Sequence, residues 1–222
     1  MNRRYLQLGV IALALVIIAY TSLDQNADQQ QADSGQPFDF YVLALSWSPA
    51  FCASEAGQRS AQQCGQGTDF GFITHGLWPQ FEQGWPSFCQ SPHGDRMPES
   101  AAQSLMDIMP DRGLIEHQWD KHGTCAGVDQ GRYAQLIDTA SQSITVPALF
   151  ESQTPASLGA GDIERAFQQA NPAIPADGIA VTCPGGRFTE VRICLDTSLS
   201  PRACAEVNRN GCQQENLSVS QR

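Results

Sequence analysis

The chain has 222 residues, of which 16% are charged, and its formal net charge is −10. That length fits one domain with a sizeable core, and a hydrophobic content of 41% excludes a wholly disordered chain. Acidic residues outnumber basic ones by 23 to 13, so no broad basic surface supplies general affinity for nucleic acid. Composition alone therefore ranks nucleic acid low among the ligands.

The N-terminus is predicted to lie outside the folded domain. Arg3 and Arg4 precede an apolar, uncharged run over residues 8–20, whose length fits the core of a secretory signal better than a membrane span. We expect residues 1–23 to be a signal peptide or, because the cleavage site is poorly marked, an uncleaved N-terminal anchor. Residues 24–36 are polar and should form a disordered linker. The protein is thus expected to be secreted or periplasmic, and to contact a membrane only if the anchor is retained.

Eight cysteines behind an export signal favour four disulfides. They are Cys52, Cys64, Cys89, Cys125, Cys183, Cys194, Cys204 and Cys212. No CxxC pair occurs and the chain has only four histidines, so a zinc site has little support and we expect no metal or other cofactor. Spacing alone leaves the pairing of the cysteines open.

Strands are predicted first along the chain. The aromatic and apolar residues 38–47 are typical of a buried strand, and residues 70–74 predict a short one that ends at His75. Small and polar residues make a long loop of residues 53–68. A second loop, residues 79–98, is rich in Gly, Pro and aromatic residues.

Helices follow, and then strands return. Apolar residues at helical spacing predict helices over residues 99–109, 114–122, 133–143 and 162–170. Two strands, residues 179–183 and 188–196, flank a Pro-Gly-Gly turn. This order predicts an α+β fold, in which an antiparallel β-sheet core packs with several α-helices. The result is a single disulfide-stapled domain over residues 37–217, followed by a frayed tail at 218–222.

The predicted helix 114–122 gathers polar groups on one face. At about 100° per residue, an arc of about 140° holds four of them: His117, Lys121, Gln118 and His122. Trp119, which should pack into the core, lies on the other side with Asp120 and Glu116. Two imidazoles, an ammonium and an amide in one small volume suit a phosphate. A metal is disfavoured, because the histidines are five residues apart, the lysine repels cations and no carboxylate shares the arc.

Three of the four histidines and the only lysine lie in two short segments, residues 72–79 and 116–125. A lone histidine is more often structural, but this concentration favours catalysis. Two histidines without a metal suit transphosphorylation, in which one imidazole takes the proton of a ribose 2′-hydroxyl and the other protonates the leaving 5′-oxygen. One histidine from each segment fits this chemistry best. The substrate would be RNA, since DNA lacks the nucleophile.

The sequence resembles the ribonuclease T2 family, whose two active-site motifs centre on HGLWP and on a segment that ends in KHGTC. Here these are residues 75–79 and 117–125, and the stretch LSWSPAFC at 45–52 is similar to the family's opening strand and first cysteine. The resemblance covers residues 37–215. It implies an endoribonuclease that cleaves single-stranded RNA and leaves 2′,3′-cyclic phosphate and then 3′-phosphate ends.

The resemblance also implies roles. His75 and His122 match the acid–base pair; we assign His122 as the base and His75 as the acid, an order that could be reversed. His117 and Lys121 match positions that bind the phosphate and stabilise the transition state. Trp78 matches an aromatic that helps to hold a base, although core packing beside a proline is an alternative for it.

Two departures from the family pattern concern catalysis and specificity. Gln118 stands where the family usually has glutamate; it can donate a hydrogen bond to a phosphoryl oxygen but cannot relay a proton. Gln80 follows HGLWP where an acidic residue is frequent, so an inherited base preference is in doubt. We expect activity to be retained, and the sequence leaves open whether Gln118 lowers it.

The resemblance further suggests the cysteine pairs 52–64, 89–125, 183–212 and 194–204. The 89–125 bond would help to hold the two motifs in register. We expect a monomer that acts on single-stranded RNA and not on DNA. Two alternatives are a catalytically weak homologue with an RNA-binding or stress-signalling role, which Gln118 motivates, and an extracellular metalloenzyme, which the ligand count disfavours.

Overall fold

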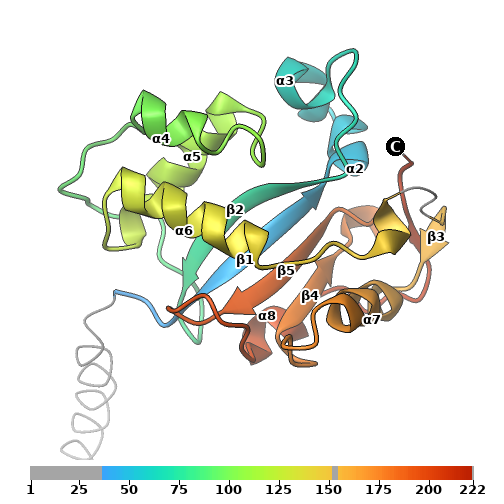
Figure 1. Cartoon of the computed structure of the whole chain (residues 1–222). Helices are drawn as coiled ribbons and strands as arrows, with labels where there is room; N and C mark the ends of the chain where they lie inside the picture. Colours follow the sequence, from blue (N-terminus) through green and yellow to red (C-terminus); the bar gives the residue numbers. More distant parts are fainter. Residues whose placement is uncertain (1–36, 152–154, 222) are drawn as a thin grey trace, which may run out of the picture. The chain divides into compact units, whose positions relative to one another are not determined.

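The computed structural model describes residues 37–151 and 155–221 (Figure 1). The predicted signal or anchor and its linker, residues 1–36, lie outside the described residues. The strands are β1 (Phe40–Trp47), β2 (Phe72–Gln80), β3 (Ser157–Leu158), β4 (Ile179–Thr182), β5 (Glu190–Leu195) and β6 (Leu217–Ser218). The α-helices are α2 (Ser48–Cys52), α3 (Ala61–Cys64), α4 (Glu99–Gln103), α5 (Arg112–Lys121), α6 (Gln130–Gln142), α7 (Ala160–Ala170) and α8 (Ala205–Arg209). Short 3-10 helices lie at Gly57–Arg59, Gly123–Cys125, Ala148–Phe150 and Pro184–Gly186.

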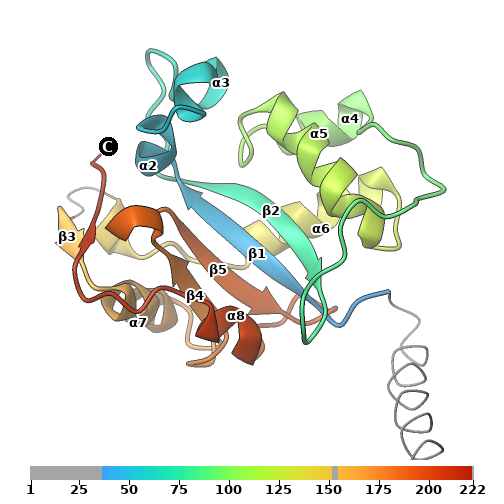
Figure 2. The same ribbon diagram turned by 180° about the vertical axis from the view of Figure 1, so that it is seen from behind.

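A four-stranded sheet in the order β2-β1-β5-β4 forms the centre of the fold, and each neighbouring pair of strands is antiparallel. Helices α4, α5 and α6 gather at the β2 end of this sheet, and α7 and α8 lie at the β4 end (Figures 1 and 2). The predicted α+β class with an antiparallel sheet is confirmed.

The two faces of the sheet differ because side chains alternate along each strand. One face carries Leu43, Trp47, Leu77 and Ile193, all of which are fully buried in the main core. On the other face β1 presents the small residues Ala44 and Ser46 between β2 and β5. These small side chains leave room for the large polar residues of the neighbouring strands.

A β-bulge interrupts the pairing of β1 with β2. Ala44 pairs with Gly76 and Leu45 pairs with Thr74, so His75 is an extra residue without a partner on β1. A bulge re-aims a side chain and is frequent beside active sites. Here it lets His75 turn toward the face that carries β5 residues Glu190 and Arg192.

All four suggested disulfides are confirmed: Cys52–Cys64, Cys89–Cys125, Cys183–Cys212 and Cys194–Cys204. The Cys89–Cys125 bond joins the loop after β2 to the segment that follows α5. The Cys194–Cys204 bond joins β5 to the residue that precedes α8. Two of the bonds therefore tie together the elements that build the site described below.

The structure corrects three predicted elements. The predicted loop 53–68 contains the 3-10 helix Gly57–Arg59 and helix α3. The predicted strand 70–74 does not end at His75, since β2 continues to Gln80; cross-strand bonds with β1 override the local glycine and proline. The predicted helix 99–109 stops after Gln103. Its second half tightens into turns that bond three residues back, and the Ile108 carbonyl accepts from the Thr74 N–H of β2 at 2.8 Å.

Fraying beyond Leu217 is also wrong for the described residues. Ser218 pairs with Ser157 of β3, and the Val219 side chain is buried. The Ser220 carbonyl accepts a hydrogen bond from Trp47 Nε1 at 2.8 Å. This buried indole N–H needs an acceptor, and the C-terminal backbone supplies it.

Candidate active site

A cavity of about 340 Å³ opens on the β1–β2–β5 face. Its lining residues are Val42, His75, Trp78, Gln80, Trp85, His117, Gln118, Lys121, His122, Arg192, Glu206, Val207 and Asn210. All seven predicted catalytic and substrate-binding residues are in this list. The cavity therefore brings together two motifs that are separated by 37 residues, 80–116, in the sequence.

Helix α5 positions the second motif. Asp111 caps its N-terminus by accepting from the Gly113 and Leu114 N–H groups. The helix ends at Lys121, and His122 follows with a non-helical φ of −121°. His122 is therefore the residue that directly follows the helix, and its side chain enters the cavity from there. The sequence analysis had placed it in a helical position on the polar arc. Trp119 is fully buried, as predicted.

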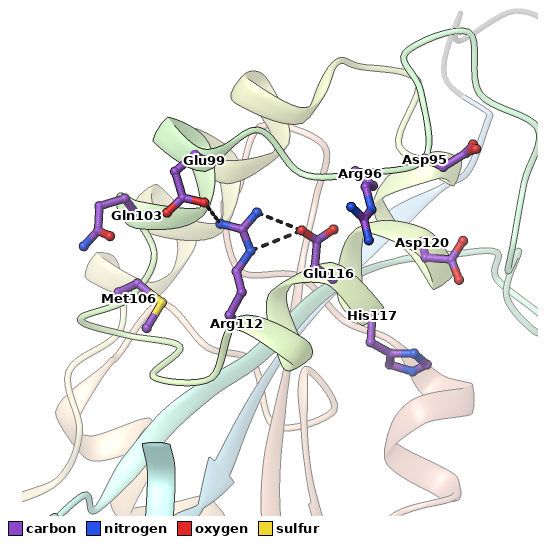
Figure 3. Close-up of a pocket in the computed structure, with 9 residues that line it drawn as sticks. All are labelled: Asp95, Arg96, Glu99, Gln103, Met106, Arg112, Glu116, His117 and Asp120. Carbon is purple, nitrogen blue, oxygen red and sulfur yellow. Dashed lines mark hydrogen bonds and ion pairs between the residues drawn. The ribbon is translucent and has the colours of Figure 1, made fainter. Parts of the chain in front are cut away.

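The other side of α5 borders a separate hollow, which Figure 3 shows. Glu116 accepts from Arg112 at 2.8 Å and from the Met97 N–H at 3.0 Å. Asp120 lines the same hollow, whereas the ring of His117 points away from the Arg112–Glu116 pair (Figure 3). Glu116 is thus committed elsewhere and cannot supply the carboxylate that Gln118 lacks.

Trp78 contacts four other residues that line the cavity. Its Nε1 donates to Gln118 Oε1 at 2.7 Å. Its ring stacks on His122 with centroids 5.2 Å apart, and His75 meets it edge-on at the same distance. The Arg192 guanidinium lies over the ring, 5.2 Å from its centroid. Trp78 thus links β2, α5 and β5.

Gln118 is only 1% exposed and packs against Gly76. A Cβ on Gly76 would lie 2.1 Å from Gln118 Oε1 and 2.5 Å from Trp78 Nε1. Glycine is required here by close approach of the two segments. Gln118 lines the cavity, so its amide nitrogen remains a candidate donor to a ligand.

His122 is 5% exposed, and within residues 37–151 and 155–221 its Nδ1 has no hydrogen-bond partner. Burial, followed by the nearby charges of Lys121, His75 and His117, lowers the pKa of His122 to about 3. At neutral pH this imidazole is therefore uncharged. It can accept a proton, and it lacks the imidazolium proton that a general acid donates.

His75 has the opposite surroundings. Its Nδ1 lies 2.6 Å from Glu190 Oε2, and Glu190 Oε1 accepts from Arg192 Nε at 2.8 Å. Burial raises the pKa of Glu190, but the bond to His75 and the charge of Arg192 outweigh burial and leave that pKa below its ordinary value. Glu190 is therefore a buried carboxylate that bonds to both His75 and the Arg192 guanidinium.

The sequence analysis missed Glu190 and Arg192. A signal was present: these two charged residues stand two positions apart in a predicted strand that is otherwise largely apolar, and so share one face. Helix α8 was missed as well. Glu206 accepts from the Gly84 N–H at 3.1 Å and closes one wall of the cavity.

Lys121 and His117 also line the cavity. In the described part of the chain, neither side chain makes a hydrogen bond or an ion pair to protein. Gln80 is 7% exposed, and its amide donates to the Pro79 carbonyl at 2.9 Å. Among the described residues no cluster of three metal-ligating side chains occurs, and none of their helices has the length and apolarity to cross a membrane.

The chain matches the model of the ribonuclease T2 family over residues 38–204. It is 34% identical over 164 residues to a ribonuclease from Aeromonas hydrophila, covering 70% of this chain and 71% of that protein. It is 26% identical to ribonuclease I from Escherichia coli K12, covering 82% and 84%. Its fold superposes on an RNase-related protein from Calystegia sepium with a TM-score of 0.65 at 22% identity, over 82% and 96% of the chains. The chain therefore belongs to the ribonuclease T2 family, and it is an endoribonuclease.

Proposed function

We propose that this endoribonuclease cleaves single-stranded RNA by metal-independent transphosphorylation. The observation that carries the proposal is the pair of histidines in one cavity, one uncharged and buried, the other paired with a carboxylate. Two such imidazoles divide the roles of base and acid. Lys121, whose side chain makes no hydrogen bond or ion pair in the described residues, lines the same cavity and supplies positive charge there.

His122 acts as the base. As a neutral imidazole it takes the proton of the ribose 2′-hydroxyl while the 2′-oxygen bonds to phosphorus. A buried, unpartnered nitrogen calls for an explanation in a native structure. A catalytic imidazole that completes its hydrogen bonds only in the substrate complex gives one.

His75 acts as the acid. It gives its proton to the 5′-oxygen as the phosphorus–oxygen bond breaks, which leaves a 2′,3′-cyclic phosphate on one fragment and a 5′-hydroxyl on the other. The roles reverse when water opens the cyclic phosphate to a 3′-phosphate. Lys121, His117 and Gln118 donate to the phosphoryl oxygens and stabilise the charge that grows on them.

Trp78 and Gln80 border the position of a nucleobase. The exposed part of the Trp78 ring tolerates any base by stacking, and the acidic surface leaves RNA affinity to this short local site. DNA is not a substrate, since it has no 2′-hydroxyl to attack phosphorus.

One assay tests the proposal. The domain without residues 1–36 is incubated with single-stranded RNA and with matched DNA in excess chelator, and the new 3′ ends are identified. We expect cleavage of RNA alone, with cyclic phosphate ends. Cleavage of DNA, or loss of activity in chelator, would contradict the proposed mechanism. Failure to cleave either strand would favour an RNA-binding role instead.

We propose that the enzyme acts outside the cytoplasm, as a monomer. The basic start, the apolar run at residues 8–20 and four disulfides support export. Mass spectrometry of the mature N-terminus, with fractionation of the producing cells, decides between a cleaved signal and a retained anchor. Sedimentation of the mature chain tests the monomer.

A further inference from the structure

Glu190 stands out because a buried carboxylate is costly unless it is paired. It is 7% exposed at the start of β5, and it pairs with Ser46 on β1 and Thr182 on β4. Each of its oxygens makes a hydrogen bond to a side chain of the cavity. One bonds to His75 Nδ1 at 2.6 Å and the other accepts from Arg192 Nε at 2.8 Å.

This arrangement depends on three local features of the sheet. The bulge frees His75 from pairing, and Ser46 on the intervening strand is small enough for the imidazole to reach across to β5. Arg192, two residues after Glu190, lies on the same face and over the Trp78 ring. The bulge and the small Ser46 side chain leave a path for the bond between His75 and a carboxylate two strands away.

From this geometry we infer that Glu190 is the positioning residue for His75 as the general acid, an inference that rests on the proposed function. The carboxylate accepts from Nδ1–H, which fixes the ring and leaves Nε2 as the nitrogen that meets the substrate. In the cleavage step Nε2 gives its proton to the departing 5′-oxygen. The neutral ring keeps its Nδ1–H, which still donates a hydrogen bond to Glu190.

Arg192 completes the device. Its Nε donates to Glu190, so the carboxylate keeps a cationic partner after His75 has given up its charge. The site thus holds a carboxylate on the strand side, opposite the position where Gln118 departs from the family's glutamate. Glu190 makes no hydrogen bond to His122, whose Nδ1 has no partner among the described residues.

The test compares two substrates that differ only in their leaving group. A dinucleotide releases a ribose 5′-oxygen, which needs the acid; uridine 3′-(4-nitrophenyl phosphate) releases 4-nitrophenolate, which does not. For Glu190→Gln we expect a fall in kcat of about 10- to 100-fold on the dinucleotide with KM unchanged. On the nitrophenyl ester the fall should be less than about threefold.

Glu116→Gln is the matched control, since Glu116 also pairs with an arginine at 2.8 Å but lies in the separate hollow on the other side of α5 and bonds to no histidine of the described chain (Figure 3). It should leave both rates unchanged. Equal losses on the two substrates, or no loss on the dinucleotide, would overturn the inference. A wild-type protein that cleaves neither substrate would instead reject the proposed function itself.

A second measurement does not depend on the folding of Glu190→Gln. In the wild-type chain labelled with ¹⁵N-histidine, the neutral His75 ring should carry its proton on Nδ1. The assignment comes from comparison with His75→Asn, which removes one set of ring signals. A neutral His75 protonated on Nε2 would contradict the inference even if Glu190→Gln proved insoluble.

Discussion

The cavity has one histidine on its strand side and one on its helix side, and the two imidazoles have opposite surroundings. On the strand side, His75 sits on a bulge with a buried carboxylate at its Nδ1. On the helix side, His122 is buried just after α5, with cationic neighbours and no acceptor for its Nδ1 in the described residues. In the proposed mechanism the surroundings, and not the residue type, divide the two histidines into acid and base.

The largest expected effect breaks the helix side outright. His122→Phe removes the base but keeps a ring of similar size against Trp78, so the fold should persist. We expect the rate of RNA cleavage to fall by at least about 100-fold, while the melting temperature changes little. Turnover close to the wild-type rate in a folded variant would refute the assignment of His122.

The pH dependence of stability is expected to report the buried imidazole. Above pH 6.5 His122 is neutral in both the folded and the unfolded chain and contributes nothing. Below that pH His122 binds a proton in the unfolded chain, but in the folded chain it stays neutral down to about pH 3. Folding should therefore weaken as the pH falls, by up to about 1.4 kcal/mol per pH unit from this group.

Urea unfolding of the wild type and of His122→Phe at pH 7 and pH 4.5 isolates that contribution. The wild type should lose more stability than the variant between the two pH values. Identical losses would show that His122 titrates normally in the folded state, and the contrast with His75 would disappear.

Gly76→Ala tests the contact that joins the two sides. The added methyl group would clash with Gln118 and with the Trp78 N–H that bonds to it. We expect the variant to unfold at lower urea, with a loss of about 1 to 3 kcal/mol, and to cleave RNA more slowly. Gly131→Ala on the exposed start of α6 is the control, since its Cβ would meet only Asp129 at 3.5 Å. Equal stability of the two variants would exclude tight packing at Gly76.

The smallest expected effect is that of Gln118→Glu on the cleavage rate. Gln118→Glu restores a carboxylate on the helix side, where it can still accept from Trp78 Nε1. Its charge should offset the cations around His122, and we expect the cleavage rate to rise a few-fold, about 1 kcal/mol or less. The initial rate on a dinucleotide measures it. An unchanged rate would mean that the missing carboxylate does not limit this enzyme.

Local patterns account for much of the fold. The apolar run of β1, the periodicity of α5 and α6 and the turn between β4 and β5 were each predictable, because their side chains bury one face at a fixed period. The tail at Ser218 and Val219 and the second half of the helix 99–109 were not. Their structure depends on partners far away in the sequence, Ser157 and Thr74.

The sequence by itself determined which side chains could do chemistry. The only lysine and three histidines in two short motifs were enough to predict a phosphate site in an acidic protein. Only the tertiary structure decided what each histidine can do. The carboxylate of Glu190 is 115 residues from His75 and reaches it through a bulge and across a strand. Burial and hydrogen bonding set the charge of an imidazole, and both are properties of the folded chain.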